Sequence, residues 1–241
     1  MLRQIIGSAL VLLSIACTGE APPREPSSAA DIISRSAENW GGMERLESLS
    51  ALRAQITYHE HDYPVTIDVS RPNLVRSTGG ERYISVFDGE RAAFLHYVDR
   101  DGIPSDPFLV DEEEVKDWEA EIAWIFPAYF DHRSDYLGLR SVEGDSLHVL
   151  QVILPLGVRM EYYLDPLTFL LRRAEAYATI RGVTHHSGRT YHDYRDVEGV
   201  KYPSHMEFFY GEGKPQPAVF ETVEFDVEFP PEHFLIPENL R

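Results

Sequence analysis

Histidine and carboxylate side chains are the residues whose spacing could support metal or acid–base chemistry, and ten histidines occur among the 241 residues. His59 and His61 are expected on one face of a predicted strand, and His185, His186 and His192 in a polar turn region. A zinc site needs three or four protein ligands, so two histidines on a strand face do not form one. We expect neither a metal site nor a cofactor.

The acidic run 111–114 is the second candidate, because paired carboxylates can act as acid and base. It directly precedes an apolar repeat, however, and negative charge is favourable at a helix start. The sequence contains no glycine-rich phosphate loop, no G-x-S-x-G turn and no H-E-x-x-H motif. We therefore expect no catalytic residues and no enzymatic activity. A metal-dependent envelope enzyme that uses the histidines is the least favoured alternative.

Cys17 is the only cysteine, and it follows Arg3 and an apolar stretch over residues 5–13, which is the layout of a secretory signal. The stretch is shorter than the roughly 20 residues that a transmembrane helix needs. Residues 13–17 (LSIAC) resemble the lipobox of bacterial lipoproteins, in which the cysteine is acylated after cleavage before it. The resemblance implies that residues 1–16 are a signal peptide and that Cys17 carries lipid. The alternative is an ordinary signal peptide with a cysteine near its cleavage site.

Residues 17–28 are rich in proline, serine and glutamate, so after the acylated cysteine they should form a flexible tether. A single folded domain is expected over 29–241, since all-β domains commonly reach ~200–250 residues. In lipoproteins of Gram-negative bacteria, an aspartate directly after the acylated cysteine is typical of proteins retained in the inner membrane. Thr18 stands there instead. We therefore expect anchoring in the outer membrane, facing the periplasm.

The chain is acidic, with 22 Lys and Arg against 40 Asp and Glu and a formal net charge of −18. Such a surface repels phosphate backbones and anionic headgroups. Nucleic acid is therefore excluded as a partner, and membrane contact is expected through the Cys17 anchor or an apolar cavity.

Hydrophobic periodicity divides the folded part into helices and strands. Residues 29–40 form an amphipathic helix pattern that begins after Ser28 and stops at Gly41-Gly42. The period changes to two at Leu52, and alternating segments recur as far as Phe229, about ten strands in all. Gly182 and Gly188 flank a predicted break, and the next strand is predicted from Tyr191 to Val197. An antiparallel sheet of this length must curl, close or split to bury its apolar face.

The clearest helix is predicted between a capping box at Asp111 and Pro127, which should end or kink it. Apolar residues recur there at steps of three and four, opposite a charged face made of Glu113, Lys116, Asp117, Glu119 and Glu121. A helix that crosses the concave face of a curved sheet turns its apolar side inward. Five residues are therefore candidates for lining a ligand cavity: Trp118, Ile122, Ile125, Phe126 and Tyr129. The same apolar side would serve equally well in a dry core.

The expected fold is mainly β (α+β), a curled, unclosed antiparallel half-barrel of about ten strands with helices covering its concave face. The order of elements resembles the LolA-like family, the half-barrel fold of lipoprotein carriers and receptors of the bacterial envelope. The segments that carry the resemblance are Trp40-Gly41-Gly42, 69–76 (VSRPNLVR), Phe87-Asp88-Gly89, 162–168 (YYLDPLT), 194–203 (YRDVEGVKYP) and the ending from Glu228 to Pro237. The resemblance implies a cavity lined by aliphatic and aromatic groups that can hold acyl chains.

The sequence thus predicts a membrane-anchored lipoprotein that binds a lipid, an acyl chain or another apolar ligand in a half-barrel cavity. Its role would be lipid or lipoprotein transport or sorting in the cell envelope. The alternative is a stress-sensing or protein-interaction module with a filled core, whose acidic outer face binds an envelope protein.

Overall fold

The computed structural model describes residues 26, 28–59 and 61–240 of the chain. The predicted signal peptide 1–16, the predicted acylated Cys17 and most of the predicted tether lie outside the described residues. Within the described ranges, no helix has the length and apolar character needed to cross a membrane.

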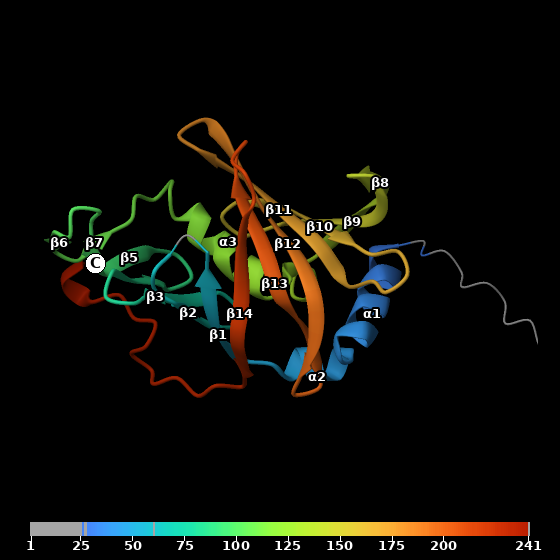
Figure 1. Cartoon of the computed structure of the whole chain (residues 1–241), viewed down its shortest axis with the longest axis horizontal. Helices are drawn as coiled ribbons and strands as arrows, with labels where there is room; N and C mark the ends of the chain where they lie inside the picture. The colour runs from blue at the N-terminus through green and yellow to red at the C-terminus, as the bar shows by residue number, and fades with distance from the viewer. Residues whose placement is uncertain (1–25, 27, 60, 241) are drawn as a thin grey trace, which may run out of the picture.

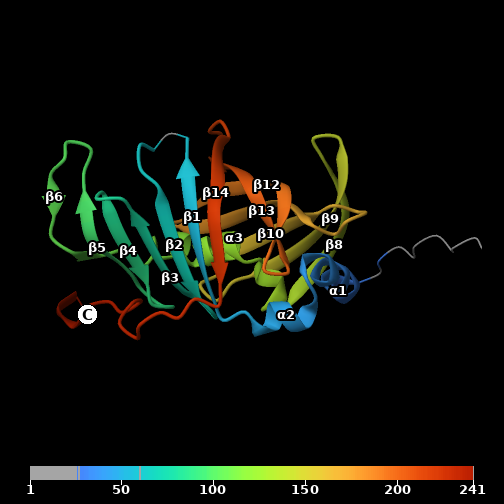
Figure 2. The ribbon, with the colours of Figure 1, turned by 60° about the horizontal axis from the view of Figure 1, so that its bottom comes forward.

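One antiparallel sheet of 14 strands dominates the structure (Figure 1). The strands are β1 (Ala51–Tyr58), β2 (Val65–Ser70), β3 (Leu74–Gly79), β4 (Tyr83–Phe87), β5 (Ala92–Val98), β6 (Pro104–Ser105), β7 (Phe108–Leu109), β8 (Ser134–Val142), β9 (Asp145–Ile153), β10 (Arg159–Leu164), β11 (Leu171–Ile180), β12 (Val183–Val197), β13 (Val200–Tyr210) and β14 (Gln216–Phe225). Their order in the sheet is β6-β5-β4-β3-β2-β1-β14-β13-β12-β11-β10-β9-β8, and β7 also pairs with β5. Strand β1 pairs with β14 in the middle of this order, and β6 and β8 stand at its two ends (Figure 2). The described sheet is therefore open, with one free edge at β6 and the other at β8.

The mainly β, unclosed antiparallel sheet is confirmed, but the prediction of about ten strands is too low. Strands β6 and β7 have two residues each, which is too short for a periodic pattern. The predicted break from Gly182 to Gly188 is wrong as well, since β12 already begins at Val183. Gly188 lies inside β12, where the ring of Phe209 takes the space of a side chain. A Cβ atom at this position would lie 2.3 Å from a carbon of that ring, so the strand needs glycine here.

Two helices, α1 (Ala29–Trp40) and α2 (Met43–Ser48), precede the sheet. The hydroxyl of Ser28 accepts a hydrogen bond from the N–H of Asp31 at 3.2 Å, and Gly41 ends α1 with φ at 137°, as the sequence predicts. The indole of Trp40 is buried and packs edge-on against three aromatic rings from β12, β13 and the short helix η1 (Ala128–Phe130). This contact attaches α1 to the sheet.

Helix α3 (Lys116–Ile125) lies against the concave face of the sheet (Figures 1 and 2). The last carbonyls of a helix have no partner within the helix. Three buried tyrosine hydroxyls from neighbouring strands donate to them: Tyr162 to the carbonyl of Ala123 at 3.2 Å, Tyr191 to that of Trp124 at 3.0 Å and Tyr202 to that of Ile125 at 2.7 Å. The helix ends two residues before Pro127, as predicted, but it begins at Lys116 after a turn, so the predicted start at a capping box at Asp111 is wrong. These hydrogen bonds fix the C-terminal end of α3 under the sheet.

Glu119 attaches α3 to a second part of the sheet, the turn between β9 and β10. Its Oε1 accepts a hydrogen bond from the N–H of Leu156 at 2.9 Å, while its Oε2 is buried with no partner among the described residues. The side chain is almost completely buried, and the loss of water around the carboxylate raises the pKa of Glu119 to about 7.

Removing the hydroxyl of Tyr202 should destabilise the protein, because the carbonyl of Ile125 would stay buried without its donor. We expect Tyr202→Phe to lower the free energy of unfolding by about 1–3 kcal/mol in urea denaturation. The control is the same change at the more exposed Tyr97, which should cost less than about 0.5 kcal/mol. A Tyr202→Phe protein as stable as the control would show that this hydroxyl does not anchor α3.

Glu119 should make stability depend on pH. Its pKa is about 7 in the folded chain against 4.5 for an ordinary glutamate, so the folded state holds the proton more tightly than the unfolded state does. The associated stability is present below about pH 4.5 and is lost as the pH rises to about 7, on the order of 3 kcal/mol. Glu119→Gln should flatten the dependence of unfolding free energy on pH across this window. An unchanged slope in the variant would contradict the assignment.

Candidate ligand-binding cavity

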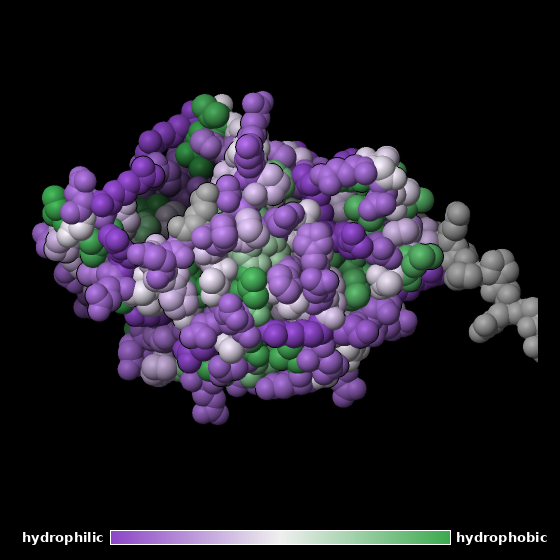
Figure 3. Space-filling view, viewed as in Figure 1, coloured by the Kyte–Doolittle hydropathy of each residue, from purple (hydrophilic) through white to green (hydrophobic). Residues whose placement is uncertain are grey.

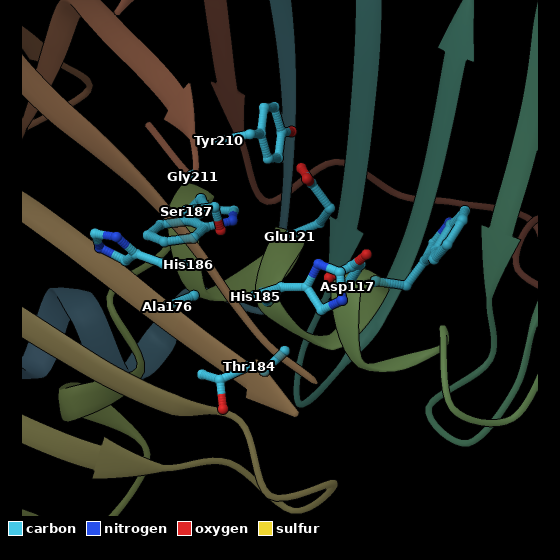
Figure 4. A pocket seen from close by; sticks show the side chains of 13 residues that line it. Asp117, Glu121, Ala176, Thr184, His185, His186, Ser187, Tyr210 and Gly211 are labelled. Carbon is cyan, nitrogen blue, oxygen red and sulfur yellow. The ribbon is translucent and has the colours of Figure 1, made fainter. Parts of the chain in front are cut away.

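Two adjacent cavities lie between α3 and parts of the concave face. The first, the hairpin cavity, has a volume of about 490 Å³ and lies between α3 and the β11–β12 hairpin (Figure 4). The second, the aromatic cavity, has a volume of about 450 Å³ and lies between α3 and strands β1–β5. Both are bordered by Trp118, Glu121 and Tyr210. Each volume is in the range of small-molecule sites, ~300–1,000 Å³.

The two cavities differ in lining. The hairpin cavity has mostly apolar lining surface, and the polar side chains of Asp117, Thr184, His185 and Ser187 lie beside Ala176 and Ala178. The aromatic cavity combines aliphatic residues with rings, among them Val65, Ile67, Val75, Tyr58, Tyr83 and Phe94. In the space-filling view, the surface is hollowed between the β5–β7 region and the β11–β12 hairpin (Figure 3). Both cavities therefore offer mostly apolar surface to a hydrocarbon chain, and the hairpin cavity adds the carboxylate, hydroxyl and imidazole groups of its polar side chains.

Strand alternation explains how β12 contributes to this lining. Successive side chains of a strand point to opposite faces. Tyr191 contacts α3, so Arg189 and Ser187 share its concave face, while Gly188 and Thr190 lie on the convex face. Arg189 is therefore directed at the helix rather than at solvent.

Arg189 is a buried cation on this face, only 4 % exposed. Its guanidinium donates to the carbonyl of Gly188 at 3.0 Å and to the hydroxyl of Tyr210 at 3.2 Å. The guanidinium carbon also lies 5.0 Å from the ring centroid of Trp124 and 5.3 Å from those of Phe208 and Tyr210. Cation–π contacts of this kind are stronger when water is excluded, so the rings offset part of the cost of burying the charge.

Glu121 lies opposite Arg189 and borders both cavities. One carboxylate oxygen is 3.7 Å from a guanidinium nitrogen of Arg189, which is longer than a hydrogen bond. Figure 4 shows the side chain extending from α3 towards Tyr210. Burial raises the pKa of Glu121, and the charge of Arg189 opposes that shift. Glu121 and Arg189 therefore form an ion pair without a hydrogen bond that fixes its geometry, and Glu121 lies where the two cavities meet.

Tyrosine hydroxyls supply further polar groups in the aromatic cavity. Tyr83 shares a hydrogen bond of 3.1 Å with the hydroxyl of Ser77, and burial raises the pKa of Tyr83 to about 12. Burial also raises the pKa of Tyr58. Both phenols therefore stay neutral near pH 7 and can donate or accept hydrogen bonds.

The five predicted lining residues occupy three different environments. Trp118 borders both large cavities. Ile122 and Phe126 border a smaller cavity of about 160 Å³. Ile125 and Tyr129 are 3 % and 1 % exposed and are packed in the main hydrophobic core.

The charged face predicted for α3 is partly wrong. The pattern assigns Glu119 and Glu121 to the side opposite the apolar residues, but Glu119 is buried and Glu121 borders both cavities. Arg189 escaped sequence reasoning because the predicted strand began only at Tyr191. The two-residue period of a strand could have placed it. Ser187 and Arg189 precede Tyr191 at steps of two, so they lie on the same strand face as Tyr191.

The histidines are placed differently from the prediction. β1 ends at Tyr58, so His59 and His61 lie beyond the strand, and His61 stacks on Tyr63 with ring centroids 5.1 Å apart. The three histidines of the predicted polar turn lie within β12 instead. Among them, His186 contacts the carboxylate of Glu175 at 3.2 Å. In the described part of the chain, no three His, Cys, Asp or Glu side chains are grouped as a metal site would require.

Comparison with known proteins identifies the fold. No family model and no curated protein matches the sequence. A LolA superfamily protein from Nitrosomonas europaea superposes with a TM-score of 0.51 at 11 % identity, covering 88 % of this chain and 99 % of that one. A DUF1329 family protein from Desulfovibrio piger gives a TM-score of 0.51 at 12 % identity, covering 86 % and 97 %. The chain therefore has the fold of a LolA superfamily protein, which confirms at the level of the fold the resemblance predicted from the sequence.

Proposed function

We propose that this protein is a membrane-anchored lipoprotein that binds a lipid or another apolar molecule between α3 and the concave face of its sheet. Its role is lipid or lipoprotein transport or sorting in the cell envelope. The observation that carries the proposal is the pair of adjoining cavities beneath α3, one of them lined largely by aliphatic and aromatic side chains. The shared fold and the acyl-chain cavity implied by the LolA-like resemblance support it.

The energetics of burial are sufficient for binding. Each methylene group removed from water contributes about 0.8 kcal/mol, so ten of them contribute roughly 8 kcal/mol. Association costs at least ~4 kcal/mol in lost freedom, and ordering of side chains adds to that cost. A cavity that already exists between α3 and the sheet keeps the second cost small, because little has to rearrange before a chain enters.

The anchor in this proposal is Cys17, because the chain itself offers little attraction to a membrane. The net charge is −18, and the face in Figure 3 is mostly hydrophilic. An acidic surface is repelled by anionic headgroups, whereas several acyl chains on one cysteine hold a protein durably. Attachment through Cys17 would keep the domain at the outer membrane, on its periplasmic side.

A protein-interaction module with a filled core would contain no large cavity under α3. The two cavities of about 490 and 450 Å³ count against that alternative and favour a ligand.

Filling the aromatic cavity tests ligand binding directly. Ser77 on β3 borders that cavity, so Ser77→Trp should place an indole in it and weaken uptake of the apolar dye N-phenyl-1-naphthylamine at least about tenfold, measured by fluorescence. The matched control is Ser141→Trp on the exposed end of β8, which should bind the dye like the parent chain. Equal uptake by both variants, or no uptake by the parent, would remove the support for a ligand cavity.

Acylation is tested in cells by metabolic labelling with an alkyne analogue of palmitate. The full chain should incorporate the label and fractionate with membranes, whereas Cys17→Ser should do neither. Replacing the neighbouring Thr18 by Ser is the control and should leave labelling intact. A Cys17→Ser protein that still takes up label at this terminus would contradict the proposed anchor.

A further inference from the structure

We propose that the ligand carries an anionic group on a hydrocarbon chain, and that Arg189 and Tyr210 hold this group where the two cavities meet. The carboxylate of a fatty acid and the phosphate of a phospholipid share the required chemistry. This inference rests on the proposed function and adds the class of ligand to it.

The permanent charge at the junction is positive. An arginine keeps its proton under all ordinary conditions, whereas a carboxylate can be protonated or can turn away. Arg189 is held in place by the carbonyl of Gly188 and by the rings of Trp124, Phe208 and Tyr210, so its position does not depend on Glu121. Among the described residues, its two hydrogen bonds use two of the five guanidinium donors. Other donors remain for an oxygen of a ligand.

Glu121 occupies the place that a ligand anion would take. Its oxygen is 3.7 Å from Arg189, so it neutralises the cation without a hydrogen bond to it. The side chain is one-third exposed and borders empty volume on both sides, which leaves it room to turn. An entering carboxylate or phosphate can approach Arg189 at hydrogen-bond distance and receive a second bond from the hydroxyl of Tyr210.

The lining of the two cavities orients such a ligand. From the junction, the aromatic cavity offers Val65, Ile67 and Val75 to a hydrocarbon chain. The hairpin cavity offers Thr184 and Ser187 to any further polar part of the headgroup. The ligand would therefore lie with its charge at Arg189 and its chain under strands β2 and β3.

A cationic amphiphile is the competing ligand, because aromatic rings and Glu121 could also surround an ammonium group. The guanidinium of Arg189 already lies against Trp124, Phe208 and Tyr210, so a second cation would meet like charge at the same rings. The observations therefore favour an anion.

Three ligands with the same chain test the charge preference: oleate, oleyl alcohol and oleylamine. Each is titrated against the dye bound to residues 18–241, a chain that keeps every described helix and strand. Oleate should displace the dye at a concentration about tenfold or more below that of either other ligand, as expected for one charge-assisted interaction. Oleyl phosphate, which carries the same single chain on a phosphate group, is the fourth arm. Stronger displacement by it than by oleate assigns the site to phosphate, and weaker displacement assigns it to carboxylate.

Glu121→Gln and Arg189→Met should move the preference in opposite directions. Removing the carboxylate of Glu121 should raise the ratio of oleate to oleyl alcohol affinity, whereas removing the guanidinium should bring the ratio close to one. Glu221→Gln on β14, an exposed matched change, should leave the ratio as in the parent. Because Arg189→Met could disturb packing, Glu121→Gln decides the question, since a fall in the ratio would overturn the inference.

The two proposals fail in distinguishable ways. If the dye binds but oleate, oleyl alcohol and oleylamine displace it equally, the anion site is refuted and the apolar cavity stands. A preference for oleylamine would refute the anion site in favour of a cationic ligand. If the dye and all four ligands fail to bind, both proposals are overturned.

Discussion

The hydrogen bonds from Tyr162, Tyr191 and Tyr202 to the last carbonyls of α3 are the constraint on which the rest of the structure depends. A helix end buried against a sheet leaves carbonyl groups that water cannot reach, and each unpaired group would cost free energy. Tyrosine joins a large apolar ring to a hydroxyl donor, so it can fill the core and satisfy the helix end at once. The C-terminal half of α3 is thereby attached to strands β10, β12 and β13.

This attachment leaves the N-terminal half of α3 over a part of the concave face that is not filled. Trp118 and Glu121 consequently border open volume, although they are only one to two helical turns from the anchored end. On the sheet side, the alternation of β12 brings Arg189 to the aromatic cavity, beside Glu121 and Tyr210, which border both cavities. The fold thus combines a rigidly held helix end, an apolar hollow and one buried cation, which together suit an amphiphilic ligand.

Local patterns allowed much of the fold to be predicted, because helix periodicity, Ser28 as a cap and Pro127 as a stop act over a few residues. The short strands β6 and β7 carry no such pattern and form only by pairing with β5. The environments of Glu121 and Arg189 depend on the packing of α3 against β12, two segments far apart in the sequence. A pattern of charges along one helix carries no information on that packing. For the same reason, the apolar side of α3 indicated Trp118 but did not separate the cavity lining from core residues such as Tyr129.

Native mass spectrometry of the full chain, extracted from its own membranes with a mild detergent, tests the central claim most directly. The account predicts a population whose mass exceeds that of the acylated chain by one non-covalently bound amphiphile, and collisional activation should release that molecule. Protein that carries only its covalent lipid, and that remains free of any releasable hydrocarbon-chain ligand when such ligands are added, would contradict the claim that the hollow under α3 is a binding site.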